Sequence, residues 1–187
     1  MRFSTMILLG LVAIATSACG TPYMREVEGP ALASPLSGQS LVNFIRPSGY
    51  GGGVDFQVFD RYEFIGNLEG KERFQYVCAP GKHLFIGRKD QVTVVDADLL
   101  PDQVYDIVVN VYPGWWQANI KLEPMSDRHP KIAELPEWEE RCDLMEYDGS
   151  GERFEGGMRR KLDRIVEDFV HGEKRDRVQV LGPNDHR

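Results

Sequence analysis

Histidine, serine and glycine-rich segments are the parts of this sequence that could carry catalytic or metal chemistry. The four histidines are scattered, at positions 83, 129, 171 and 186, and none has the i, i+4 or paired-cysteine spacing of a zinc site. Ser150 lies in Asp-Gly-Ser-Gly-Glu, which differs from the Gly-x-Ser-x-Gly nucleophile elbow. The glycine run at 51–53 precedes a strand pattern, whereas a phosphate loop precedes a helix. The sequence therefore predicts no catalytic residue, no metal site and no cofactor.

Acidic side chains raise two further possibilities, a calcium site and a glycan-acting hydrolase. Asp96, Asp98 and Asp102 supply oxygen atoms of the kind that calcium binds. Their spacing is not that of an EF-hand, and a solvated strand end and turn is the simpler interpretation. Paired carboxylates can also hydrolyse glycosidic bonds when the fold sets their separation. Because no pair stands out, a glycan-acting hydrolase is kept as an alternative only.

Cys78 and Cys142 have no convincing histidine neighbour, so we interpret them as packing or disulfide residues. In an oxidising compartment the two can pair. A bond between them would staple the C-terminal segment to the strands that precede it. The alternative is two separate free thiols, one or both of them buried.

The first 18 residues have the three parts of an export signal: a positive start at Arg2, an apolar run and then small residues. The apolar run is about ten residues long, against the roughly 20 that a spanning helix needs. The segment Thr-Ser-Ala-Cys at 16–19 resembles the bacterial lipobox, which implies that Cys19 carries lipid at the mature N-terminus. Gly20 after it implies the periplasmic face of the outer membrane. The alternative is an ordinary signal peptide cut near Ala18.

The charge balance is acidic, with 22 Lys and Arg against 29 Asp and Glu and a formal net charge of −7. Nucleic-acid-binding proteins concentrate positive charge, so nucleic acid is excluded as a partner. The same balance argues against electrostatic docking on anionic lipid. We therefore expect the membrane contact to be the lipid on Cys19.

Proline and glycine breaks divide the mature chain into three parts. Residues 19–38 are interpreted as a flexible linker that holds the domain just clear of the lipid headgroups. Residues 39–124 predict an antiparallel β-sandwich of the immunoglobulin-like or prealbumin-like kind. Tyr105, soon after Leu100 and Pro101, fits a tyrosine corner whose hydroxyl bonds back to the upstream turn. Strands are expected over 40–47, 54–60, 62–68, 73–79, 82–89, 91–99, 104–112 and 116–124.

Residues 125–187 predict a helical C-terminal extension with a frayed tail. One helix is expected over 135–147, with Pro136 near its first turn. A second is expected over 158–171, ended by Gly172. The apolar stripes of the two helices consist of Trp138, Cys142 and Met145, and of Met158, Leu162, Ile165 and Phe169.

Tyr112, Trp115 and Trp116 flank a Pro-Gly turn and form a candidate binding patch. Neighbouring residues of a strand point to opposite faces, so at least one tryptophan is expected outside the core. Exposed aromatic rings can stack on sugars or anchor a protein partner. The alternative is that one tryptophan fills the core and the other packs under the C-terminal helices.

Short motifs in the strands resemble a family of bacterial lipoproteins defined by domain of unknown function 2846. They are Arg46-Pro47, Ile65-Gly66, Pro80-Gly81-Lys82-His83 and Tyr105. The resemblance covers about 39–124 and implies a β-sandwich at the cell envelope with no established activity.

Together these features predict a lipid-anchored envelope lipoprotein that acts as a non-catalytic binding or scaffold module. Its expected partners are the membrane, through the lipid, and an envelope protein or glycan. The alternatives are an envelope enzyme and a carrier of small apolar ligands inside the sandwich.

Overall fold

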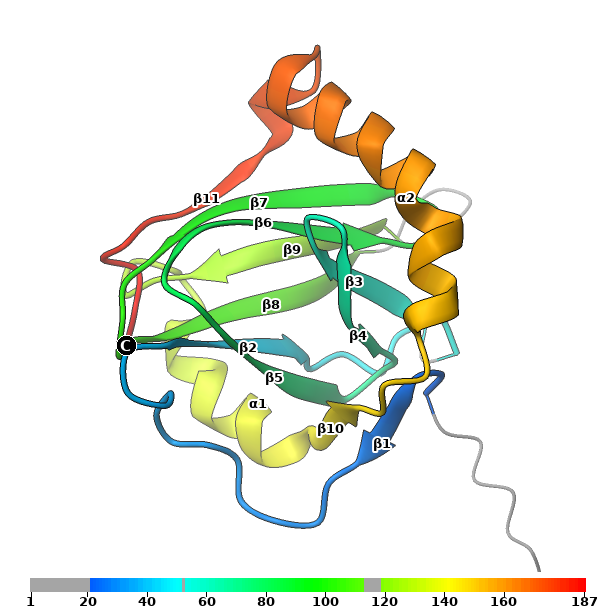
Figure 1. Ribbon diagram of the computed structural model, residues 1–187. Helices are drawn as coiled ribbons and strands as arrows, with labels where there is room; N and C mark the ends of the chain where they lie inside the picture. Colours follow the sequence, from blue (N-terminus) through cyan, green and yellow to red (C-terminus); the bar gives the residue numbers. More distant parts are fainter. Residues whose placement is uncertain (1–20, 52, 113–118) are drawn as a thin grey trace, which may run out of the picture.

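In the part of the chain that the structure describes, two β-sheets pack face to face, with a helix against the outer face of each (Figure 1). The computed structural model describes residues 21–51, 53–112 and 119–187. The first sheet, here the β2 sheet, has the order β1-β10-β5-β2-β8-β9, and the second, the β6 sheet, has the order β11-β7-β6-β3-β4.

The strands of the β2 sheet are β1 (Met24–Glu26), β10 (Asp143–Tyr147), β5 (Glu72–Cys78), β2 (Ser40–Arg46), β8 (Val104–Tyr112) and β9 (Asn119–Met125). The strands of the β6 sheet are β11 (Gln179–Leu181), β7 (Val92–Leu99), β6 (Gly81–Arg88), β3 (Phe56–Asp60) and β4 (Glu63–Leu68). The helices are α1 (Leu135–Arg141) and α2 (Glu152–Val166), with a π-helical turn (Glu167–His171) after α2 and 3-10 turns at Ile132–Glu134 and Arg175–Arg177.

Alternation along the central strands places the main core between the sheets. In β2, Phe44 points inwards, whereas Asn43 and Ile45 lie on the outer face. Phe44 stacks on Phe74 of its own sheet at 4.9 Å between ring centroids. It also meets Phe85 of the β6 sheet edge-on at 5.3 Å. Aromatic rings therefore fill the space between the two sheets.

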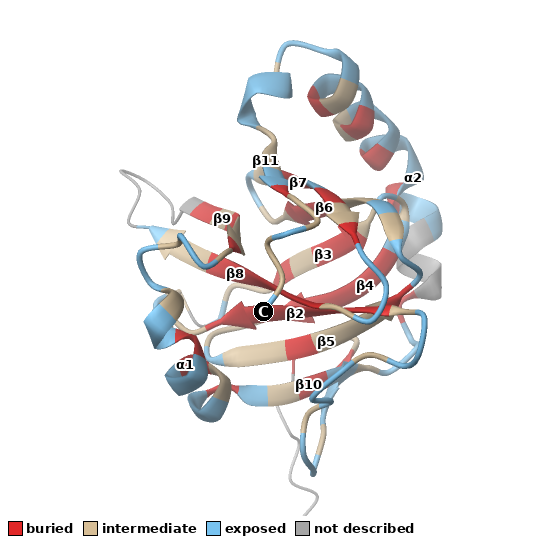
Figure 2. Ribbon diagram, turned by 90° about the vertical axis from the view of Figure 1, so that its left-hand side faces the viewer, coloured by how far each residue is buried: buried red, intermediate tan, exposed pale blue. Residues whose placement is uncertain are grey.

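The two helices cover the outer faces through separate apolar clusters. Figure 2 shows both helices buried on the side toward their sheet and exposed on the other. The cluster under α2 contains Met158, Leu162, Val166, Phe59, Phe64, Ile86 and Val94. The cluster under α1 contains Leu135, Trp138, Ile45, Val108 and Met125.

The prediction of a mainly β chain is confirmed, and the eight expected strands are present as β2 to β9. The prediction of purely antiparallel sheets is wrong. β2 pairs parallel with β8, β10 with β5, and β11 with β7. Each of these pairs joins segments that are far apart in sequence, so no hairpin turn sets their relative direction.

The tyrosine corner expected at Tyr105 is present. Its hydroxyl accepts a hydrogen bond from the Leu100 amide at 2.9 Å and donates to the Pro183 carbonyl at 3.0 Å. Burial raises the pKa of the Tyr105 hydroxyl. The corner thus ties the start of β8 to the upstream turn and to the chain near its C-terminal end.

The flexible linker predicted over 19–38 is wrong for the residues that the structure describes. Thr21 is only 4 % exposed and its hydroxyl donates to Glu72. Residues 24–26 form β1, antiparallel to β10. The Leu32 amide donates to Gln75 Oε1 at 2.7 Å, and its carbonyl accepts from Gln75 Nε2 at 3.0 Å. Proline and glycine interrupt the alternation of apolar residues in this segment. Pairing of β1 with β10 and the hydrogen bonds to Gln75 do not require such an alternation.

The helical extension predicted over 125–187 is only partly right. α1 ends at Arg141, and β10 follows, because Met145 is drawn into the core between the sheets. α2 begins at Glu152, earlier than expected. The tail is not frayed: β11 joins the β6 sheet, and the Arg187 amide donates to the Val104 carbonyl at 3.1 Å.

Candidate functional site

A pocket with both polar and apolar walls opens on the outer face of the β2 sheet, beside α1 and the segment 31–33. Its volume is ≈ 530 Å³, which lies within the range of small-ligand sites. We call it the outer pocket. It is lined by Ala31, Leu32, Ala33, Arg73, Gln75, Val104, Glu139 and Arg187.

A row of polar side chains crosses three strands beneath the outer pocket. The sheet register places Gln75 of β5 opposite Asn43 of β2, and Asn43 beside Asp106 of β8. Gln75 Nε2 donates to Asn43 Oδ1 at 2.9 Å, and Asn43 Nδ2 donates to Asp106 Oδ1 at 2.7 Å. Because each group is satisfied by its neighbour, the row fixes the floor of the outer pocket.

Arg187 closes one side of the outer pocket by joining two carboxylates. Its Nε lies 3.3 Å from Asp106 Oδ2, and its two terminal nitrogens lie 2.6 and 3.1 Å from the Glu139 oxygens. Asp106 is 3 % exposed, and burial raises its pKa although Arg187 opposes the shift. Hydrogen bonding to Glu139 raises the pKa of the Arg187 guanidinium. The pairing holds these charges in place.

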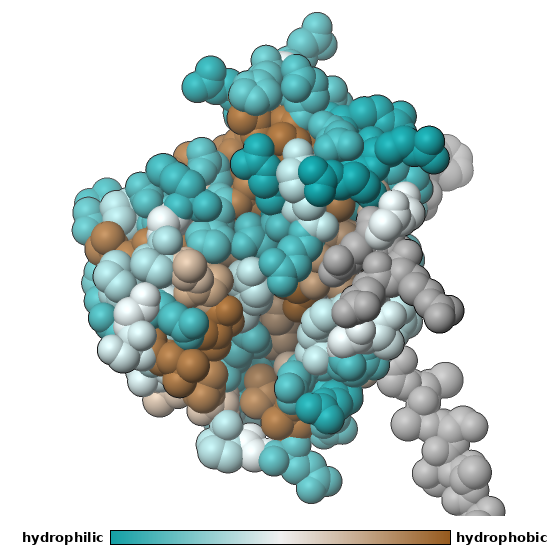
Figure 3. All heavy atoms as spheres, viewed as in Figure 1, coloured by the Kyte–Doolittle hydropathy of each residue, from teal (hydrophilic) through white to brown (hydrophobic). Residues whose placement is uncertain are grey.

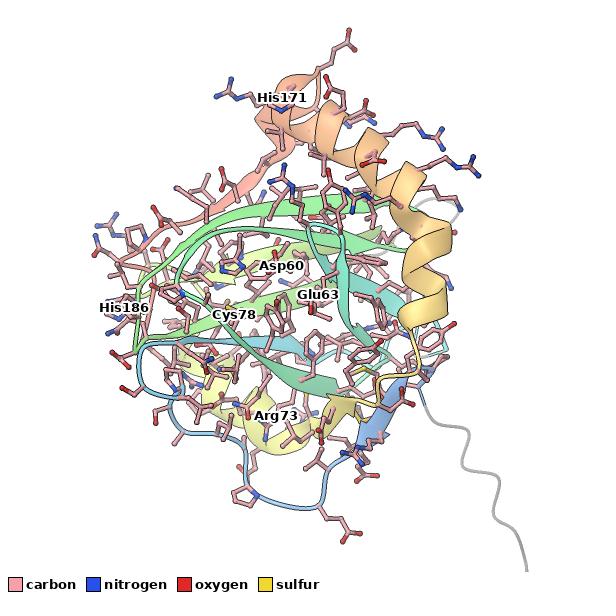
Figure 4. All side chains as sticks on the ribbon, viewed as in Figure 1. Asp60, Glu63, Arg73, Cys78, His171 and His186 are labelled. Carbon is pink, nitrogen blue, oxygen red and sulfur yellow. The ribbon has the colours of Figure 1, made fainter. Side chains whose placement is uncertain are left out.

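Arg73 is the cation of the outer pocket that the fold leaves available. Its Nε donates to the Cys142 carbonyl at 3.4 Å, and no described carboxylate lies within ion-pair distance of its guanidinium. Figure 4 labels its side chain beneath the β2 sheet, near α1. A guanidinium can bind a carboxylate or phosphate in two-pronged geometry. The outer pocket therefore offers an anion-binding group beside the apolar wall of Leu32 and Val104.

The structure also brings together a cysteine, a histidine and an aspartate that the sequence keeps apart. His83 Nδ1 lies 2.6 Å from Asp60 Oδ2, and His83 Nε2 lies 2.8 Å from the Ala79 carbonyl oxygen. Tyr76 donates to the same Asp60 oxygen at 3.2 Å. Hydrogen bonds to Asp60 and Cys78 raise the pKa of His83 to about 10. Both ring nitrogens of His83 are thus held by acceptors, which fixes the imidazole beside the turn between β5 and β6.

The possible disulfide between Cys78 and Cys142 is absent. Both are free, buried thiols, which is the alternative that the sequence left open. Cys78 ends β5, whereas Cys142 precedes Asp143, which pairs with Glu72 at the other end of that strand. The length of the strand separates them by about 20 Å, and a disulfide needs Cα atoms closer than about 7 Å. Burial raises the pKa of the Cys142 thiol to about 11.

Of the predicted aromatic patch, only Tyr112 lies within the described residues, and Trp115 and Trp116 lie outside them. Tyr112 is 44 % exposed, and its hydroxyl donates to Glu123 Oε1 at 2.6 Å. That bond raises the pKa of Tyr112 to about 12. Asn110 also donates to Glu123. The hydrogen bond to Glu123 thus fixes the exposed ring of Tyr112 at the end of β8.

Arg46 holds the glycine-rich loop that precedes β3. Its guanidinium is fully buried and donates to the carbonyls of Val54 (2.5 Å), Leu68 (2.9 Å), Gly51 (2.8 Å) and Tyr50 (3.3 Å). Burial lowers the pKa of Arg46. This loop is therefore tied to the β2 sheet by one side chain.

Two of the aspartates near the end of β7, Asp98 and Asp102, make structural contacts. Asp98 pairs with Lys82 at 3.0 Å, and Asp102 accepts from the Gly38 amide at 2.7 Å. No group of three His, Cys, Asp or Glu that could hold a metal ion occurs among the described residues. Nor does the described part of the chain contain a helix long and apolar enough to cross a membrane. The signal peptide predicted over 1–18 and Cys19 lie outside the described residues.

Sequence reasoning missed the outer pocket. A usable signal was present, because Asn43 and Asp106 interrupt otherwise apolar strands at positions that face away from the main core. Buried polar residues of this kind need hydrogen-bonding partners. Arg73 and Arg187 had no such signal, since they reach the pocket only through the tertiary structure.

Comparisons with known proteins identified no relative of this chain. No family model matches the chain, and no curated protein or solved structure matches it either. The resemblance to the lipoprotein family of domain 2846 therefore stays a prediction.

Proposed function

We propose that this chain is a lipid-anchored lipoprotein of the bacterial cell envelope, carried on Cys19 at the periplasmic face of the outer membrane, and that its two-sheet domain is a non-catalytic binding module. The observation that carries the binding role is the outer pocket. Its floor is held by a hydrogen-bonded row, and Arg73 is left available beside it.

The charges of the outer pocket favour recognition over catalysis. Glu139 lines the outer pocket and Asp106 lies beneath it, and both carboxylates are held by Arg187. A glycan-acting hydrolase needs one carboxyl group to give up a proton and the other to act as base or nucleophile. One guanidinium shared by both carboxylates opposes that division of roles. His83, fixed by two acceptors, supports the same conclusion.

The ligand that fits this surface is an envelope protein or glycan that presents a carboxylate. Arg73 would bind the carboxylate, and the apolar side chains of 31–33 would cover the adjoining carbon skeleton. A second hollow of ≈ 320 Å³ lies on the other side of Leu32 and shares Gln75 with the outer pocket. This arrangement suits an extended ligand. The phenylalanine rings that fill the core count against a carrier of apolar molecules.

Site-specific photo-crosslinking in intact cells tests the binding role. A photoreactive phenylalanine analogue replaces Ala33 in the outer pocket, and the control position is Leu36, which is 64 % exposed and outside it. We expect adducts from position 33 that disappear in an Arg73→Gln background. Equal adducts from position 36, or none from position 33, would refute the binding module. Product release from an envelope glycan by the purified protein would support the hydrolase instead.

Cell fractionation tests the anchor. Cys19→Ala should move the protein from the membrane to the soluble fraction, because the lipid would have no attachment point. A variant that still sediments with membranes would contradict lipid attachment at Cys19.

The immunoglobulin-like or prealbumin-like form of the fold is also proposed, and the Tyr105 corner supports it.

A further inference from the structure

The folded domain begins very close to the proposed lipid attachment point. Thr21 is already buried and bonded to Glu72. Cys19 is two residues earlier in the sequence, and two extended residues reach about 7 Å. This step rests on the proposed anchor. If Cys19 carries lipid, the surface around Thr21 must lie at the level of the headgroups.

The start of α2 lies beside this entry point. The Asp148 amide donates to the Tyr23 carbonyl at 3.0 Å, and the Tyr23 ring meets the Phe64 ring at 5.6 Å. Gly151, directly before α2, is so close to Phe64 that an added Cβ would stand 2.9 Å from that ring. Figure 1 shows β1 and the first turns of α2 on the same side of the molecule.

The outer face of α2 carries cations that the fold does not neutralise. Arg160, Lys161 and Arg164 are all exposed, and they line a shallow hollow with Gly157 and Asp163. Within the described residues, none of the three cations takes part in an ion pair. Figure 4 shows nitrogen-tipped side chains projecting from α2 into solvent, and Figure 3 shows this helix as a strongly hydrophilic surface.

A neighbouring cation differs in this respect and defines the limits of the patch. Arg159 pairs with Asp163 at 3.4 Å, and its guanidinium lies 3.6 Å from the centre of the Tyr62 ring. It is thus committed to the fold. At 1.5 Å per residue, Arg160 lies about 12 Å along the helix from Glu152, and Arg164 lies about 18 Å along it.

We infer that the face of α2 formed by Arg160, Lys161 and Arg164 docks on anionic phospholipid headgroups, so that the domain lies on the bilayer and does not hang from a tether. Charge complementarity and the short distance from Cys19 to the folded domain identify this occupant. Basic residues next to a lipid anchor strengthen membrane binding by general electrostatics. The acidic net charge of −7 is a property of the whole chain and does not describe this face.

Fluorescence quenching on vesicles tests the inference with the lipidated full chain. Gly157→Cys places an NBD label in the same hollow, one helical turn before Arg160 and Lys161, and a headgroup nitroxide in the vesicles acts as quencher. Vesicles of phosphatidylcholine alone are compared with vesicles containing phosphatidylglycerol. We expect quenching only with phosphatidylglycerol. Arg160→Gln with Arg164→Gln should lower the docking equilibrium about 25-fold, at about fivefold per cation.

The control variant carries Lys82→Gln and Arg141→Gln, two exposed cations outside α2, and should dock like the parent. The docking would be overturned, and the anchor left intact, if the vesicles carry the protein but quenching does not depend on lipid charge or on the two α2 substitutions. Protein that does not attach to either vesicle would overturn both. Quenching that requires lipopolysaccharide in place of phosphatidylglycerol would assign the face to a glycolipid and overturn the phospholipid proposal.

Discussion

His83→Gln is expected to remove a pH-dependent part of the free energy of unfolding. His83 is held between Asp60 and the Ala79 carbonyl, and hydrogen bonds to Asp60, Cys78 and Ala79 favour its protonated form. Glutamine has a similar length and can still donate one hydrogen bond, but it does not titrate. The difference in stability between the two proteins therefore isolates the proton on His83.

The size and sign of this effect follow from the raised pKa. His83 has a pKa of about 10 in the folded protein, against about 6.5 in an unfolded chain. The folded state thus holds the proton more tightly. The stabilisation is complete below about pH 6.5, declines as the pH rises, and is lost above about pH 10. At about 1.4 kcal/mol per pKa unit, it amounts to at most about 5 kcal/mol. The His83 and Asp60 side chains are each 13 % exposed, so solvent screens them little.

Urea unfolding at intervals between pH 5.5 and 9.5 measures this difference. We expect the stability advantage of the parent protein over His83→Gln to fall by about 1.4 kcal/mol per pH unit between pH 7 and 9.5. His171→Gln, on the exposed turn after α2, is the matched control and should follow the parent curve. A pH-independent difference, or an NMR titration of His83 centred near pH 6.5, would refute the reasoning.

Three further predictions concern buried groups. Arg46→Met should lower the free energy of unfolding by about 3–5 kcal/mol in urea titrations, because it strands the carbonyls that the buried guanidinium satisfies. Gly87→Ala should cost about 1–3 kcal/mol and lower the Tm in calorimetry, since its Cβ would stand 2.4 Å from the Phe56 ring. Cys78 and Cys142 should both react with a thiol reagent after unfolding and neither before it, and a non-reducing mass that lacks two hydrogens would contradict this.

Local patterns predicted much of the strand content. Runs of alternating apolar residues placed β2 to β9, because side chains of a strand point alternately to opposite faces and each run is short enough to be marked by its turns. The Tyr105 corner could also be predicted, since the tyrosine and its partner Leu100 are close in sequence.

Pairings between distant segments could not be predicted in this way. β10 and β11 are short, and their sequences resemble helix or tail, but a partner strand supplies their hydrogen bonds. The same limit applies to the outer pocket. Gln75, Asn43 and Asp106 lie on three strands that become neighbours only in the β2 sheet.

The sequence by itself determined that this is a mainly β chain of acidic composition, and it predicts an export signal over 1–18 followed by a lipid-bearing Cys19. These properties depend on neighbouring residues. The tertiary structure alone decided that Cys78 lies far from Cys142, that Arg187 reaches Asp106, and that α2 presents unpaired cations near the start of the folded domain. Such contacts depend on where long connections return the chain, and local propensity does not set that.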